Sequence, residues 1–300
     1  PRQPIRGHAH VPGAPQREVA ELLPQRALLP EAPRGGLHGL VQKDEPAPLA
    51  EVADEVEVLE QALETATARG SVQVVVLRGA QGLGRTRLAM AVGERAHEQG
   101  RAVTWRVEHH PGEAPGEAVR QATRRELRLE GLDATERLER LREHGPSGLD
   151  PTLLANWLGD DERIRARMPP REQRALALGT LYGVSRDQPM VLVLDDAHHD
   201  LEALELVDHL LARQQRTPSP LLVVLTVQEQ GLVEAPRVLE LLEDLVDDEA
   251  VTEVVLSPLD PVARRRLGRS LVGLDGGVSQ RLEQRTEGNP QYVVELVRSW

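Results

Sequence analysis

Apolar residues recur along this chain in the two periods that distinguish strands from helices. Runs of β-branched residues and leucine predict strands at residues 72–77, 190–194, 221–227 and 251–256, with a weaker one at 102–107. Such nearly continuous apolar runs are typical of strands buried on both faces of a parallel sheet. Helical spacing appears at 50–68 and 87–99, and the regular alternation predicts an α/β fold with a mainly parallel sheet flanked by helices.

The chain divides into three predicted regions. Residues 1–48 are rich in proline and lack periodicity, which predicts a disordered linker. Residues 49–257 contain all the predicted strands and form the predicted main domain; within it, residues 111–188 are charged and helix-rich, which predicts a helical insertion. Residues 258–300 show helical periodicity only and are interpreted as the start of a C-terminal helical subdomain, a lid that the sequence cuts short.

A glycine-rich motif lies between the first strand and the helix after it. Residues 79–86 read GAQGLGRT and fit the phosphate-loop pattern G-x-x-x-x-G-K-[ST] except at the lysine, where Arg85 stands. Glycines let backbone amides turn around phosphates, and the next helix directs its unpaired amides and its dipole at the anion. The pattern predicts a P-loop NTPase domain that binds ATP or ADP with Mg²⁺, with Thr86 as a ligand of the metal. The predicted nucleotide contacts here are Gly79, Gly82, Leu83, Gly84, Arg85, Thr86 and Arg87.

The exchange of lysine for Arg85 changes the shape of the cation rather than its charge. Lysine ends in a compact ammonium that fits between β- and γ-phosphate oxygens, whereas arginine ends in a broad planar fork. We therefore expect nucleotide binding to survive and hydrolysis to be slow at most. The alternative is that the motif is a glycine-rich turn without a ligand.

Two carboxylates close the third predicted strand, where parallel α/β sheets place their ligands. We predict that Asp195 orients Mg²⁺ through water and that Asp196 polarises the attacking water. The alternative is an acidic strand end that caps the following helix, because Asp200 also stands at a plausible N-cap.

The composition of the chain argues against several classes of binding partner. The net charge of −12 and the pI near 5.4 argue against direct binding of nucleic acid, and no apolar run approaches the roughly 20 residues that span a bilayer. The absence of cysteine excludes disulfides and thiolate metal sites, so we expect a cytoplasmic protein without membrane partners. The pairs His109-His110 and His198-His199 do not predict a metal site, because adjacent residues point apart. The arginine-rich and glutamate-rich stretch 120–142 predicts a solvated helix surface.

From about residue 50 onward the order of motifs resembles the bacterial signal-transduction ATPases with numerous domains, a branch of the AAA-like P-loop proteins. Residues 78–88 are similar to that family's phosphate loop, and residues 194–200 to its acidic strand end. Residues 287–296 are similar to its helical-subdomain signature, which implies that Pro290 lies against the nucleotide base. The resemblance implies a module of LuxR-type transcription regulators or of proteins attached to serine/threonine kinases, where it acts as a nucleotide-controlled switch and assembly platform.

This sequence departs from that family at three nucleotide-facing positions. Besides Arg85, the family's Gly-Arg-Glu before the first helix aligns with residues 53–55, which read ADE, and its arginine after the fourth strand aligns with Gln228. These losses predict a weakened ATPase.

Three functions follow from these observations. The first is a switch in which nucleotide bridges the sheet domain and the lid and controls flanking effector or sensor domains. The second is a pseudo-ATPase that only holds its neighbours together. The third, a motor or DNA-associated ATPase, is disfavoured by the acidic balance. Self-association is left open.

Overall fold

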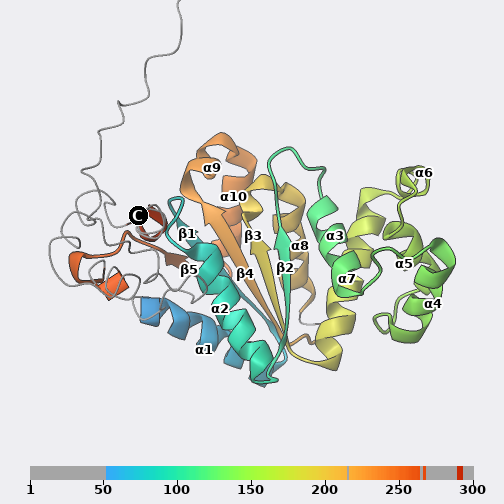
Figure 1. Ribbon diagram of the computed structural model, residues 1–300, viewed down its shortest axis with the longest axis horizontal. Helices are drawn as coiled ribbons and strands as arrows, with labels where there is room; N and C mark the ends of the chain where they lie inside the picture. The colour runs from blue at the N-terminus through green and yellow to red at the C-terminus, as the bar shows by residue number, and fades with distance from the viewer. Residues whose placement is uncertain (1–51, 215, 264–265, 268–288, 293–300) are drawn as a thin grey trace, which may run out of the picture.

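A computed structural model describes residues 52–214, 216–263, 266–267 and 289–292 of the chain (Figure 1). The predicted linker, residues 1–48, lies outside the described residues, as does most of the predicted helical subdomain at 258–300. The bounds predicted for the three regions therefore stay predictions.

Five strands form one sheet in the order β2-β3-β4-β1-β5, and every neighbouring pair is parallel. The strands are β1 (Val72–Gly79), β2 (Val103–Glu108), β3 (Met190–Asp195), β4 (Leu221–Gln228) and β5 (Val251–Val255). The five predicted strands and the α/β class are thus confirmed. Because β4 lies between β1 and β3, side chains that follow β1 and β3 can meet only across the end of β4.

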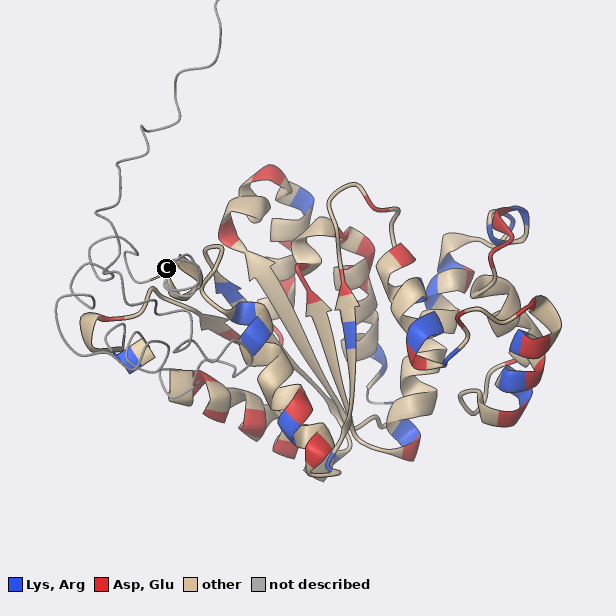
Figure 2. Ribbon diagram, in the orientation of Figure 1, with Lys and Arg blue, Asp and Glu red and all other residues tan. Residues whose placement is uncertain are grey.

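Helices cover both faces of the sheet, as the buried residues show. One face packs against α1 (Ala53–Arg69) and α2 (Arg85–Glu98), and the other packs mainly against α7 (Pro170–Asp187), α8 (Leu201–Arg213) and α10 (Pro236–Val246). Strands β3 and β4 lie in the middle of this sandwich, and their apolar side chains are almost fully buried. Figure 2 shows the result, because charged residues gather on the helices and leave the central strands nearly free of charge.

The predicted helical insertion between β2 and β3 is confirmed. It consists of α3 (Glu117–Glu126), α4 (Ala134–His144), α5 (Pro151–Trp157), α6 (Glu162–Arg165) and α7. Helices α4, α5 and α6 form a lobe beyond the β2 edge, far from β1 and β5 (Figure 1). The shorter elements elsewhere are the 3-10 turn Ala197–His199 and α9 (Glu229–Glu234).

The prediction that residues 120–142 form only a solvated surface is wrong at two positions. Arg120 and Arg137 are buried, with 6% of each residue exposed. Arg120 pairs with Glu117 in the same helix. Arg137 Nη2 donates to Asp160 Oδ2 at 3.0 Å, and Asp160 lies between α5 and α6. Charge alternation along a sequence does not distinguish an arginine on a solvated helix surface from one that is buried and paired with a nearby carboxylate.

Within the described residues, no helix is long and apolar enough to cross a membrane. The cytoplasmic location stays a prediction.

Candidate nucleotide site

The glycine-rich loop joins β1 to α2 at the carboxyl end of the sheet. Gly82 and Gly84 have φ angles of 83° and 91°, which only glycine adopts without strain. Helix α2 begins at Arg85, two residues earlier than predicted, and no side chain caps it. Its first amides therefore have no partner within the helix and can bind an anion.

The loop and the acidic strand end meet through one hydroxyl. Thr86 Oγ1 donates to Asp195 Oδ1 at 2.7 Å, although 109 positions separate the two residues. Thr226 near the end of β4 joins them, because its Oγ1 donates to the same Oδ1 at 2.7 Å and accepts from the amide of Asp196 at 2.8 Å. Thr226 was not among the predicted site residues; a hydroxyl in an otherwise apolar strand run was the available signal.

Arg85 is buried inside the loop, with 7% of the residue exposed. Its Nη1 donates to the carbonyl oxygens of Gly79 and Ala80, and its Nη2 lies 3.5 Å from Asp196 Oδ1. Burial lowers the pKa of Arg85, and the carboxylates of Asp196, Asp195 and Glu229 oppose that shift. The guanidinium therefore links the base of the loop to the acidic strand end.

Asp195 accepts hydrogen bonds on both carboxylate oxygens. Its Oδ2 accepts from Arg106 Nη2 at 2.7 Å, in addition to the two hydroxyl bonds on Oδ1. Burial alone would raise the pKa of Asp195, but the bonds from Arg106, Thr226 and Thr86 outweigh burial and lower it. Arg106 was not among the predicted site residues, because the pattern of β2 does not show which neighbouring strand its side chain reaches.

These donors change what Asp195 and Thr86 can offer to Mg²⁺. Thr86 and Asp195 are bonded to each other, and a guanidinium already neutralises the carboxylate. A divalent cation beside Asp195 would have to displace Arg106 or accept its repulsion. As arranged, the residues predicted to hold Mg²⁺ do not fit that ion.

Asp196 has a different environment from its neighbour. Its φ of 50° is unusual for a residue other than glycine, and within the described residues its Oδ1 is buried without a hydrogen bond. Burial, followed by repulsion from Asp195, raises the pKa of Asp196 against the attraction of Arg85. The same Oδ1 forms an ion pair with Arg85, and the raised pKa makes this carboxylate suited to accept a proton from water.

Two histidines are buried against these carboxylates, with 3% of each exposed. His109 Nδ1 bonds to the carbonyl oxygen of Asp195 at 2.9 Å, so this nitrogen carries the hydrogen. His198 Nδ1 accepts from the amide of Gln228 at 3.4 Å, and burial is the largest cause that lowers the pKa of His198 to about 4. These residues were considered above only as metal ligands. In the structure they pack against the acidic strand end, and burial lowers the pKa of each.

A cavity of about 290 Å³ lies beside the loop. Its walls include Leu83, Gly84 and Arg87 from the predicted site, Glu55 from α1, and Pro290. Glu55 aligns with the glutamate of the family's Gly-Arg-Glu, whereas the lost arginine aligns with Asp54, which is not among the lining residues. The contact of Pro290 with a nucleotide base stays a prediction. The other described lining residues are mostly apolar and belong to α1, to α2 and to residues 255–267.

Residues 289–292 contact the loop directly. Asn289 Nδ2 donates to the carbonyl oxygen of Gln81 at 2.8 Å, and the amide of Gln291 donates to that of Gly82 at 3.2 Å. A Cβ on Gly82 would lie 2.5 Å from Asn289 Oδ1, so glycine is required for this approach. The segment after the sheet therefore closes one side of the loop.

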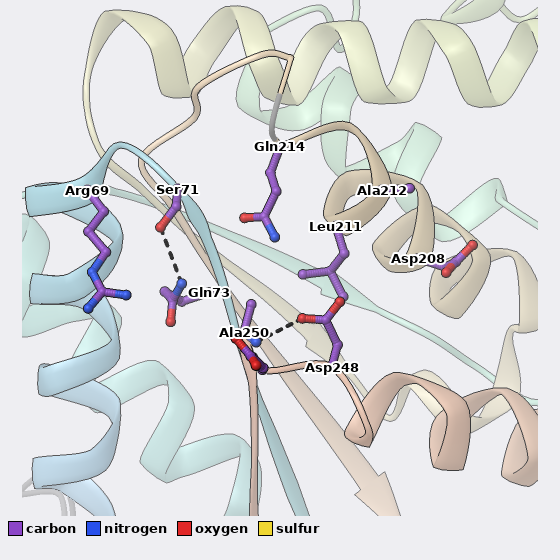
Figure 3. Close-up of a pocket in the computed structure, with 10 residues that line it drawn as sticks. Arg69, Ser71, Gln73, Asp208, Leu211, Ala212, Gln214, Asp248 and Ala250 are labelled. Carbon is purple, nitrogen blue, oxygen red and sulfur yellow. Dashed lines mark hydrogen bonds between the residues drawn. The ribbon is translucent and has the colours of Figure 1, made fainter.

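A larger hollow of about 700 Å³ opens at the opposite end of the sheet (Figure 3). It lies between the start of β1, the end of α8 and the turn before β5, and its lining is largely polar. Within it, Gln73 donates to Ser71 Oγ at 3.2 Å and the amide of Ala250 donates to Asp248 Oδ1 at 2.8 Å. None of the predicted site residues lines this hollow, so we assign the site to the loop end.

Sequence comparison gives one family match. Residues 53–224, more than half of the chain, match the AAA ATPase domain family. No curated protein matches the sequence.

Solved structures share the fold at low identity. The Aeropyrum pernix ORC1 protein in complex with DNA is 16% identical, with a TM-score of 0.51, and the match covers 87% of this chain and 62% of that one. The Aeropyrum pernix ORC2 protein in its ADP form is 13% identical, with a TM-score of 0.46 and coverages of 85% and 64%. This chain therefore spans less than two thirds of the length of those proteins, and the likeness to ORC1 concerns the fold alone.

Proposed function

This chain belongs to the AAA ATPase domain family, and on that premise we propose that residues 79–86 bind the phosphates of ATP or ADP. The observation that carries the proposal is the 2.7 Å bond from Thr86 to Asp195, which unites the loop and the acidic strand end in one site. The unpaired amides of α2 and the Arg85 guanidinium supply positive potential, and the cavity of about 290 Å³ beside them accepts the base.

We further propose that the domain is a regulatory switch in a multidomain bacterial signalling protein. Residues 289–292 contact the loop. A nucleotide bound at the loop would therefore contact both the sheet domain and the segment that follows it. Flanking effector or sensor domains are the proposed partners. The acidic net charge of −12 disfavours nucleic acid as a direct partner of this segment.

A saturable response to nucleotide tests the binding site. At about 100 times its Kd, ADP or ATP should raise the unfolding free energy by roughly 2.7 kcal/mol, which thermal-shift titration detects. Arg85→Ala should weaken binding about 10-fold to 100-fold, because a charged hydrogen-bond donor to phosphate is lost. Arg69→Ala is the matched control, since Arg69 lines the opposite hollow, and it should bind like the wild type.

The scaffold function is the second candidate, and the position of Arg85 favours it. Its guanidinium is bonded to the carbonyl oxygens of its own loop, an arrangement that stabilises the turn without any ligand. A flat thermal-shift response to millimolar nucleotide, from protein shown to be folded, would contradict the switch and leave the scaffold.

Slow hydrolysis is proposed to depend on Asp196. Loop amides and Arg85 would hold the phosphates, while the partly exposed Asp196 carboxylate would take the proton of the attacking water. Asp196→Asn should lower the turnover number for ATP about 100-fold, because an amide cannot accept that proton. Phosphate release measured at saturating ATP checks this, with the ADP affinity expected to change little. Equal turnover by the variant and the wild type would remove Asp196 from the chemistry.

A further inference from the structure

Both carboxylate oxygens of Asp195 already accept hydrogen bonds from the protein. Three donors reach its two oxygens, namely the hydroxyls of Thr86 and Thr226 and the guanidinium of Arg106. Only 5% of Asp195 is exposed, so solvent contributes little to its hydrogen bonding. The carboxylate is thus paired by the protein itself.

Arg106 is fixed in this role by its strand. In the register of β2 with β3, Arg106 lies opposite Val193 and Glu108 lies opposite Asp195. Its Nη1 pairs with Glu108 Oε1 at 2.9 Å while its Nη2 pairs with Asp195 Oδ2 at 2.7 Å. The guanidinium therefore bridges the carboxylates at the ends of two neighbouring strands, and one third of its side chain remains exposed at the site.

A divalent cation and this guanidinium would compete for the same carboxylate. Two positive groups at contact distance repel each other even at the effective dielectric of a protein surface. Arg85 adds a second guanidinium on the other side, 3.5 Å from Asp196. The site therefore already holds two guanidinium groups, those of Arg85 and Arg106, and a metal bound with the nucleotide would add a third positive group.

We propose that Arg106 takes the charge-compensating position beside Asp195, and that a nucleoside di- or triphosphate binds this site without Mg²⁺. The inference rests on the proposed nucleotide site. Arg85 at the loop and Arg106 at the strand end then neutralise the phosphate-facing side of the site.

Binding of a fluorescent ADP analogue tests whether nucleotide binds without Mg²⁺. The analogue carries an N-methylanthraniloyl group on the ribose, and its dissociation constant is measured in excess EDTA and in excess MgCl₂. The Kd of the wild type in MgCl₂ should equal its Kd in EDTA within about twofold. The Kd of Arg106→Gln should be lower in MgCl₂ than in EDTA by a factor of about ten or more. Arg106→Lys, which keeps the charge, should remain independent of Mg²⁺. The matched control is Arg101→Gln, since Arg101 precedes the same strand but pairs with Glu60 and should behave like the wild type.

A second readout does not depend on affinity. Electron paramagnetic resonance measures how much Mn²⁺ is bound in a mixture of protein and ADP. The amount that ADP binds without protein is measured separately and subtracted. We expect no additional Mn²⁺ on the wild type and one ion on Arg106→Gln.

The outcomes separate this inference from the proposed function. A wild type that binds nucleotide tightly only with Mg²⁺ would overturn the inference and keep the nucleotide site. Independence of Mg²⁺ in both the wild type and Arg106→Gln would overturn the role of Arg106. Absence of nucleotide binding under all conditions would overturn the proposed function, and the inference with it.

Discussion

Replacing Asp195 by alanine should lower the free energy of unfolding by about 3–5 kcal/mol, the range expected when one partner of a buried charged network is removed. The substitution would leave two hydroxyls and one guanidinium without their acceptor, those of Thr86, Thr226 and Arg106. Thr226 is fully buried, so water cannot replace its bond. Urea denaturation followed by circular dichroism measures the loss.

Asp208→Ala is the matched control for this experiment. Asp208 is an exposed carboxylate near the opposite end of the sheet, and its loss should change stability by no more than about 0.5 kcal/mol. The double variant Asp195→Ala with Arg106→Ala should recover part of the loss, because it removes a guanidinium that has lost one of its two carboxylate partners and keeps only Glu108. A single Asp195→Ala variant as stable as Asp208→Ala would show that the network contributes nothing to folding.

Acidification should destabilise the fold between about pH 6.5 and pH 4 through His198. Burial, followed by the charges of His199, Arg85 and His109, lowers the pKa of His198 from 6.5 to about 4. In this window the unfolded chain binds a proton that the folded chain refuses, so stability is fully present above pH 6.5 and declines as pH falls. The contribution of this one group reaches about 3 kcal/mol near pH 4.

Urea titrations at a series of pH values measure that contribution. His198→Gln should show a shallower decline than the wild type, since glutamine is neutral throughout and can still accept from the Gln228 amide. His97→Gln is the control, because His97 is exposed near the end of α2 and its loss should leave the decline unchanged. Burial also lowers the pKa of His109, so a residual decline in His198→Gln is expected. Identical declines in His198→Gln and the wild type would contradict the assignment.

The layers of this protein and its glycine-rich loop can be predicted from the sequence alone. Runs of valine and leucine predict strands because side chains on both faces must be apolar when helices cover both sides of a sheet. Gly82 and Gly84 indicate the loop, because their positive φ angles exclude other residues without strain. Asp195 and Asp196 are identifiable because a parallel sheet brings its carboxyl ends to one edge.

Which groups pair at that edge depends on the order of the strands. Strand order is not encoded in periodicity, and the place of β4 between β1 and β3 brings Thr226 to the same oxygen of Asp195 that Thr86 contacts. Likewise, Arg106 reaches Asp195 because β2 is the neighbour of β3, a pairing between segments 89 positions apart. Hydrophobic pattern fixes the faces that strands bury, whereas the charges that meet at their ends depend on which strands become neighbours.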